Sequence, residues 1–465
     1  MINQNSIYNA SPYWLQELFL NIYACRIHFQ RFGNKFLRLL DEWEKFAFAS
    51  SQEINEFQNK QLQMIIKHAY STVPYYRNTM ERLKLTPSDF KGTEDLAKLP
   101  ILTREHVKNN LNNLLSKNYK MKNLIPGHTS GTTGSPLEFF WDNHMCLINN
   151  VADWRQKKWA GLNYGEKHAV LLGRTIVPAN AMSPPFWRMN HLHNQLWMSS
   201  FHMTEINLPL YLEKLKTFKP KIIEGYPSTV YILAKYLESK NEIFPVSAIL
   251  TSSETLYPIQ RETIEKVFSC RIFDFYGLAE RTVFATECNH HQGHHLNMDY
   301  GITEILDGKS EPVPHGKRGW IVGTSLHNMG MPFLRYKTSD ISSIKNESCS
   351  CGCNYPLMEA VTTKAEDIIV TKDGRFISPS VLTHPFKPMH HIKESQIVQE
   401  DEENITIKIV KHEGYSEKDT EQLLASFSSR VGEGMKINLE FVEEIKREAN
   451  GKFRWVISKV PVNFQ

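Results

Sequence analysis

The stretch that decides the fold is His128-Thr129-Ser130-Gly131-Thr132-Thr133-Gly134-Ser135-Pro136, which gathers five hydroxyl residues and two glycines. Glycine lets backbone N–H groups turn toward an anion without steric cost, and hydroxyls add hydrogen-bond donors. We therefore predict an anion-binding loop for phosphate groups. A plain Ser/Thr/Gly surface turn is the alternative reading. A Walker A loop is excluded because no Gly-Lys-Ser/Thr follows.

Short apolar runs alternate with longer helical stretches after this loop. The runs are residues 168–173, 221–224, 248–252 and 271–275. This alternation is typical of βα units and predicts an α/β core. From residue 300 to 345 the pattern changes to strands joined by Gly and Pro turns.

The two ends of the chain carry other patterns. Residues 13–90 predict helices broken at Pro74, and Thr103 is the predicted N-cap of a further helix within 99–113. The C-terminal part predicts a smaller α+β unit, with strands at 367–371, 396–399, 405–410 and 437–441 and a helix at 415–431. A length of 465 residues exceeds one core. We predict a large N-terminal α/β domain, residues 1–363, and a small α+β domain, residues 364–465.

The composition is that of a soluble globular protein. Hydrophobic residues make up 41% and charged residues 22%, which argues against disorder. The net charge of +4 arises from 54 basic and 50 acidic residues and is nearly balanced. It gives no basis for a nucleic-acid partner, which requires a clustered basic face.

The N-terminal residues 1–12 are polar and lack the apolar segment of a signal peptide, so we expect a cytoplasmic protein. The apolar stretch 13–29 is interrupted by Glu17, Arg26 and His28. It predicts an amphipathic helix docked on the protein's own core and no integral membrane segment. Peripheral membrane contact is the alternative.

Four later segments carry side chains suited to nucleotide chemistry. They are Phe275-Tyr276-Gly277-Leu278-Ala279-Glu280, Arg335-Tyr336-Lys337-Thr338-Ser339-Asp340, Thr363-Lys364-Ala365-Glu366-Asp367 and Asn450-Gly451-Lys452-Phe453-Arg454. Taken singly, each is an ordinary strand end, charged linker or surface turn. In this order and spacing after the hydroxyl-rich loop, they resemble the adenylate-forming superfamily of acyl-CoA synthetases, peptide-synthetase adenylation domains and luciferases.

This resemblance implies an ATP site. Glu280 would bind Mg²⁺, a metal that prefers few carboxylates together with phosphate oxygens. Lys452 would stabilise the charge that builds between the substrate carboxylate and the α-phosphate. The other ATP contacts would come from Thr129, Ser130, Gly131, Thr132, Thr133 and Gly134 at the phosphates, Tyr276 and Gly277 at adenine, and Asp340 at both ribose hydroxyls.

The resemblance also implies the acyl pocket and a hinge. Ser253 and Glu254 would lie beside the adenine and the acyl group, and Gly225-Tyr226-Pro227 would border the acyl pocket. Lys364 stands where the superfamily has an Arg on the ribose, and it lacks the planar fork of Arg. Glu366 would be the hinge about which a mobile C-terminal domain rotates.

Three of the seven cysteines, Cys349, Cys351 and Cys353, fall within five positions. A large chain without a secretion signal does not favour disulfides, whereas thiolate and imidazole ligands suit tetrahedral Zn²⁺. A Cys-x-Cys pair needs ligands from elsewhere, which Cys288 and one histidine of residues 290–295 could supply. Buried free thiols are the alternative.

Cys349-Ser350-Cys351-Gly352 with Pro356 resembles a segment of phenylacetate–CoA ligase-like enzymes, in the branch often encoded with capsule and surface-polysaccharide genes. Zinc-bearing members pair this segment with a Cys and a His seven positions apart. The resemblance thus implies a structural zinc on Cys288, His295, Cys349 and Cys351. His294 is the rival of His295, and Cys353 is an alternative ligand.

We therefore expect an AMP-forming ligase that activates a small carboxylic acid with ATP as an acyl-adenylate and transfers the acyl group to CoA. An amine, such as an amino sugar of a surface polysaccharide, is the alternative acceptor. A degenerate nucleotide-binding protein is the third hypothesis, motivated by Lys364 and the missing glycine of that motif. The identity of the acid, the acceptor and the oligomeric state, including a homodimer, stay open.

Overall fold

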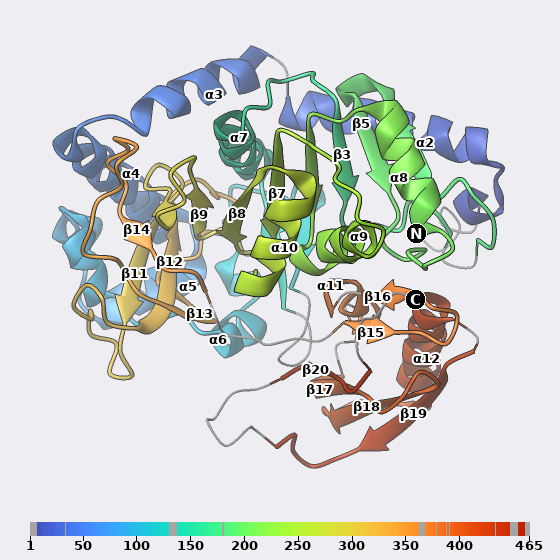
Figure 1. The fold of residues 1–465 in the computed structure, drawn as a ribbon. Coiled ribbons are helices and arrows are strands. Elements are labelled where there is room, and N and C mark those ends of the chain that lie inside the picture. Colours follow the sequence, from blue (N-terminus) through green and yellow to red (C-terminus); the bar gives the residue numbers. More distant parts are fainter. Residues whose placement is uncertain are drawn as a thin grey trace.

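A computed structural model describes residues 7–32, 34–129, 137–178, 181–361, 368–377, 379–386, 388–389, 391–432, 434–446 and 454–460. Helices cover both sides of a central sheet, and a smaller unit formed by the C-terminal residues lies beside this layered part (Figure 1). None of the helices in these ranges has the length and apolar character needed to cross a membrane.

The central sheet has nine strands in the described residues, in the order β14-β10-β9-β8-β7-β6-β3-β5-β4 (Figure 1). The strands from β8 to β5 run parallel, and antiparallel strands extend the sheet at both edges. The bounds are β3 His168–Leu171, β4 Trp187–Asn190, β5 Gln195–Met198, β6 Ile222–Gly225, β7 Ala248–Ser252, β8 Arg271–Gly277, β9 Phe284–Glu287, β10 His294–Leu296 and β14 Leu357–Met358. The predicted α/β core is confirmed.

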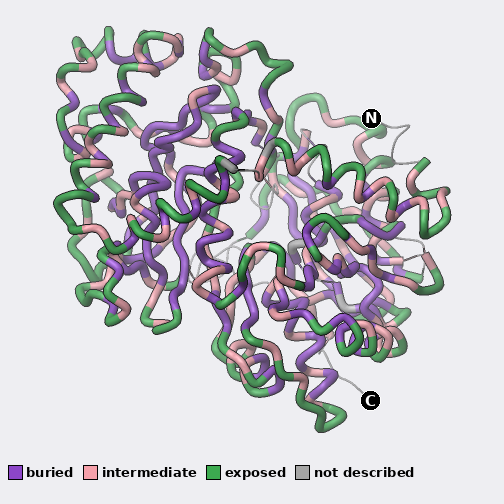
Figure 2. Tube along the Cα trace, turned by 90° about the horizontal axis from the view of Figure 1, so that it is seen from above, coloured by how far each residue is buried: buried purple, intermediate pink, exposed green. Residues whose placement is uncertain are grey.

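Strand β7 shows why its sequence is apolar on both faces. All five of its residues are buried, because helices pack on each side of the parallel strands. Ile249 faces the helices α8 (Leu208–Phe218), α9 (Pro227–Ser239) and α10 (Pro258–Phe268). Ala248 and Leu250 face α3 (Asn34–Phe46) and α7 (Asn143–Trp159). In Figure 2 the strands are buried, and exposure is concentrated on the surrounding segments.

The N-terminal region is helical, as predicted. Helix α2 (Tyr13–Arg31) packs on β4 and α7, so it docks on the protein's own fold. Helix α4 (Ser51–Thr72) ends before Pro74, which begins α5 (Pro74–Arg82), the position where proline lacks no needed donor. Thr103 caps α6 (Arg104–Asn109) by accepting a hydrogen bond from the backbone N–H of His106. This helix is shorter than the range predicted.

Two smaller sheets flank the central one. Strands β1 (Ile125–His128) and β2 (Glu138–Trp141) form an antiparallel hairpin on either side of the hydroxyl-rich loop. Strands β11 (Gly301–Leu306), β12 (Gly319–Ser325) and β13 (Tyr336–Ser342) form an antiparallel three-stranded sheet. The strands predicted between residues 300 and 345 are therefore present.

The C-terminal part forms the predicted smaller α+β unit. A two-stranded sheet pairs β15 with β16, and within the described residues a second sheet has the order β19-β18-β17-β20. Helix α12 buries Leu423 and Phe427 against this second sheet. The bounds are β15 Ile369–Val370, β16 Phe376–Ile377, α11 Pro379–Leu382, β17 Ile392–Gln399, β18 Asn404–Lys411, α12 Glu417–Val431, β19 Lys436–Phe441 and β20 Val456–Ser458.

A buried ion pair joins α7 to the turn before β11. Arg155 Nη1 and Nη2 donate to Asp299 at 2.5 and 3.1 Å. The guanidinium carbon lies 5.4, 5.7 and 5.4 Å from the ring centres of Trp43, Trp159 and Tyr355. Burial opposes the positive charge of Arg155, but Asp299 outweighs burial and raises its pKa.

We expect Asp299→Asn to destabilise the protein by about 3–5 kcal/mol, because it leaves the charge of Arg155 buried without a counter-ion. Urea unfolding followed by tryptophan fluorescence measures the effect. The matched control is Asp41→Asn, which removes an exposed ion pair with Lys45 and should leave the unfolding midpoint nearly unchanged. Equal effects of the two substitutions would contradict the role given to the buried pair.

Candidate functional site

The predicted site residues meet at the carboxyl ends of the parallel strands, the edge where α/β sheets bind ligands. Gly225 ends β6, Ser253 and Glu254 follow β7, and Tyr276 lies near the end of β8. The backbone N–H of Ser228, on α9, donates to Glu254 Oε2 at 3.1 Å. The residues predicted for adenine and for the acyl group therefore share one edge.

The residues predicted for adenine and ribose are in direct contact. The hydroxyl of Tyr276 donates to Asp340 Oδ2 at 2.8 Å, which joins β8 of the central sheet to β13 of the small sheet. Burial, followed by the charge of Asp340, raises the pKa of Tyr276 well above its usual value. Adjacent positions for these two side chains are what binding of a single nucleoside requires.

Glu280 lies beside this pair and is buried. Its Oε1 accepts a hydrogen bond of 2.7 Å from the hydroxyl of Tyr336. Burial raises its pKa above that of an ordinary glutamate, while the Tyr336 hydrogen bond and the charge of Arg104 oppose the rise. A buried carboxylate of this kind is costly without a cation, and that fits the binding of Mg²⁺ by Glu280.

Arg104 is a site residue that the sequence analysis did not single out. One of its guanidinium nitrogens donates to Thr129 Oγ1 at 3.0 Å, at the start of the predicted phosphate loop. Its charge also acts on Glu280 and on Tyr336. The only local signal was a cation directly after the helix cap Thr103. The loop residues Ser130–Gly134, Lys364, Glu366 and Lys452 lie outside the described residues.

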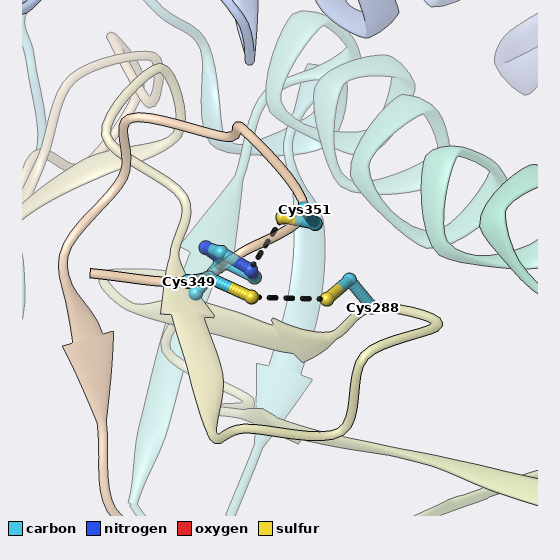
Figure 3. A group of neighbouring side chains, drawn as sticks. Cys288, Cys349 and Cys351 are labelled. Atoms are coloured by element: carbon cyan, nitrogen blue, oxygen red, sulfur yellow. Dashed lines mark hydrogen bonds between the residues drawn. The ribbon is translucent and has the colours of Figure 1, made fainter. Parts of the chain in front are cut away.

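The cysteine cluster converges as predicted. The ligand atoms of Cys288, His295, Cys349 and Cys351 all lie within 4.8 Å of one another. The Sγ atoms of Cys288 and Cys349 are 3.6 Å apart, and Cys351 Sγ lies 3.4 Å from His295 Nε2 (Figure 3). Strand β10 and the segment before β14 supply ligands that are far apart in the sequence.

His295, and not its neighbour His294, faces the cysteines. Successive residues of β10 point to opposite faces, so His294 turns to Asp274, with 3.0 Å between Nε2 and Oδ2. His295 Nδ1 lies 3.3 Å from the carbonyl oxygen of Tyr355, which leaves Nε2 free to bind a metal. Cys353 is buried but is not part of the four-residue group.

The donor set fits a metal ion. Burial lowers the pKa of His295 to about 4, so the imidazole is neutral at neutral pH, as a ligand must be. Burial raises the pKa of the Cys288 thiol, so its thiolate form requires a nearby cation. Three thiols and one imidazole at this spacing match the preference of tetrahedral Zn²⁺, with no position left for a reacting water.

Comparison with known proteins gives the class of the chain. Residues 369–459 match the CapK C-terminal domain family. The chain is 26% identical to protein CapK of Staphylococcus aureus over 98% of this chain and 99% of that one. It is 23% identical to the phenylacetate-coenzyme A ligase of Thermus thermophilus, over 69% of this chain and 72% of the relative.

A solved structure shares the fold. The crystal structure of 2-hydroxyisobutyryl-CoA ligase, in complex with 2-HIB-AMP and CoA, aligns with a TM-score of 0.59 at 19% identity, covering 88% of this chain and 91% of that one. Together, these similarities place the chain in the adenylate-forming superfamily. Within it, the chain falls in the phenylacetate–CoA ligase-like branch linked to CapK.

The raised pKa of Glu280 gives a testable pH dependence. Between the unfolded and the folded pKa, the folded protein binds more protons than the unfolded chain, so stability falls as the pH rises through this window. Glu280→Gln removes the penalty and still accepts from Tyr336. The variant should therefore melt above the wild type at neutral pH in the absence of nucleotide, with a smaller gap at acid pH.

Differential scanning calorimetry at several pH values checks this expectation. The control is Glu262→Gln, at an exposed position of α10, which should show no such pH-dependent gap. A melting-temperature gap for Glu280→Gln that does not change with pH would contradict the assigned origin of the shift.

Proposed function

We propose that the protein activates a carboxylic acid with ATP and transfers the resulting acyl group to CoA. The carrying observation is the cluster of Tyr276, Asp340 and Glu280 at the carboxyl edge of the sheet, next to the start of the hydroxyl-rich loop. Similarity to named phenylacetate-coenzyme A ligases supports the proposal.

The first step joins the acid to AMP. A carboxylate oxygen attacks the α-phosphorus, the bond from the α-phosphorus to the bridging oxygen breaks, and pyrophosphate leaves. Mg²⁺ on Glu280 would offset the negative charge of the phosphates when bound. Asp340 and Tyr276 would orient the nucleoside, and Lys452 would stabilise the charge on the attacked phosphate.

The second step moves the acyl group. The thiol of CoA loses its proton and its sulfur attacks the acyl carbonyl carbon, after which AMP leaves with its phosphate oxygen. We propose residues 1–363 and 364–465 as the two domains and Glu366 as the hinge between the steps. The separate core formed by residues of β15 to β20 supports this division, and its contact through Phe201 supports docking on the large domain.

Acid-dependent exchange of labelled pyrophosphate into ATP tests the first step. Lys452→Ala should lower this exchange roughly 10²–10³-fold, the usual effect of removing a group that stabilises transition-state charge. Lys446→Ala, which removes an exposed lysine six residues earlier, is the matched control and should retain the activity. Full exchange by Lys452→Ala would show that the lysine is wrongly assigned.

The acceptor is tested separately by mass spectrometry of the products. Formation of an acyl-CoA supports the proposal, whereas an amide formed only with an amino sugar would identify the alternative acceptor. ATP binding without exchange, across a broad panel of acids, would instead identify a degenerate nucleotide-binding protein.

We also propose that Cys288, His295, Cys349 and Cys351 hold a structural zinc. Protein purified without chelators should contain about one zinc per chain, and Cys288→Ser should lose both the metal and thermal stability. Elemental analysis and thermal unfolding measure these changes. Cys25→Ser, at an exposed position, is the control that should keep the metal. Metal-free protein with an unchanged melting temperature would refute the zinc site.

A further inference from the structure

Three arginines from separate elements interact beside the candidate site. Arg31 ends α2, Arg174 follows β3, and Arg281 comes directly after Glu280. The charges of Arg281 and Arg174 both act on Arg31. Like charges this close repel one another, and the repulsion grows where burial lowers the dielectric constant.

Arg281 is buried and held in a fixed orientation. Its guanidinium carbon lies 3.8 Å from the ring centre of Trp141, at the end of β2, and its Nη1 donates to Cys146 Sγ, on α7, at 3.0 Å. The backbone of Arg281 has φ +57°, a left-handed conformation that costs free energy for a non-glycine residue. The cation is therefore oriented by an aromatic face and a thiol.

Arg31 lacks a full set of partners. Its Nε atom is buried without a hydrogen-bond partner among the described residues. Burial lowers its pKa; Cys146 opposes the shift, and the charges of Arg281 and Arg174 add to it. No carboxylate is among the groups that act on this arginine.

Other arginines of the large domain show the contrast. Arg155 pairs with Asp299 at 2.5 Å, Arg261 with Glu287 at 2.8 Å and Arg335 with Glu304 at 2.9 Å. In the part of the chain that the structure describes, no such ion pair is found for Arg31 or Arg281. A buried cation is normally paired, so an anion that the protein itself does not provide fits here.

The position of the arginines indicates which anion. Arg174 lies with its guanidinium carbon 4.7 Å from the ring centre of Trp197, and its charge acts on Tyr226 in the proposed acyl pocket. Arg281 contacts Trp141, whereas the adjacent Glu280 contacts Tyr336 and the nucleotide side. The cations thus lie toward the acyl side of Glu280.

We infer that the acid activated by this protein carries a second anionic group, a carboxylate or a phosphate, bound by Arg281 and Arg31 with Arg174 nearby. The inference rests on the proposed function. A planar guanidinium can donate two parallel hydrogen bonds to either group, which selects for charge and geometry together. Trp141 would pack on the opposite face of the Arg281 guanidinium.

The experiment compares matched pairs of acids in the pyrophosphate exchange assay. The pairs are succinate with butyrate and 4-carboxyphenylacetate with phenylacetate, and 3-phosphonopropionate represents the phosphorus anions. The wild type should favour the dianionic member in kcat/KM. Arg281→Met should lower this preference roughly tenfold or more, as expected for the loss of a charge-assisted hydrogen bond.

Two further variants separate charge from folding. Arg281→Lys keeps the charge without the fork and should retain part of the preference. Arg271→Met removes an exposed arginine at the opposite end of β8, where its side chain is 64% exposed, and should leave the preference unchanged. The KM for ATP should be the same in all variants.

The outcomes distinguish this inference from the proposed function. Exchange with monoanionic acids at an unchanged ratio in Arg281→Met would overturn the inference while leaving the function intact. A rise in the KM for ATP with every acid would assign the arginines to the nucleotide and would also overturn it. Absence of exchange with all acids, in the wild type, would overturn the proposed function itself.

Discussion

The buried ion pair between Arg155 and Asp299 positions both halves of the large domain. Arg155 lies on α7, the helix that covers one face of the central sheet, and Asp299 lies in the turn that leads into the three-stranded sheet. The aromatic rings around the guanidinium include Tyr355, whose carbonyl oxygen contacts His295 of the cysteine cluster. An ion pair is directional, unlike apolar packing, so it fixes the helix, the turn and the cluster relative to one another.

The candidate site separates two kinds of charge over a short length of chain. Glu280 contacts Tyr336, near the carboxylate of Asp340, while the next residue, Arg281, contacts Cys146 and Trp141. The left-handed backbone at Arg281 is part of how consecutive side chains reach different elements. Carboxylates suited to a metal and ribose thus lie on one side, and cations suited to an anionic substrate group lie on the other.

The fold was largely predictable because its signals are local. β7, for example, is a short apolar run whose predicted and observed bounds coincide, as expected for a strand covered on both faces. Thr103 was predicted as a helix cap, and its side chain does accept from the backbone at His106. The length of α6 was overestimated, since local patterns locate the start of a helix better than its end. The cysteine spacing also predicted the right cluster, although not which adjacent histidine joins it.

The sequence by itself determined the class of the protein, through the hydroxyl-rich loop and the ordered motifs that end in Glu280 and Asp340. These are runs of consecutive residues whose chemistry can be read without knowing their neighbours. Only the tertiary structure decided that Arg104 reaches Thr129 and that Arg31 lies near Arg281, because these contacts join residues far apart in the chain. Charge pairing depends on such distances, so the anion preference of the site follows from the fold and not from any one motif.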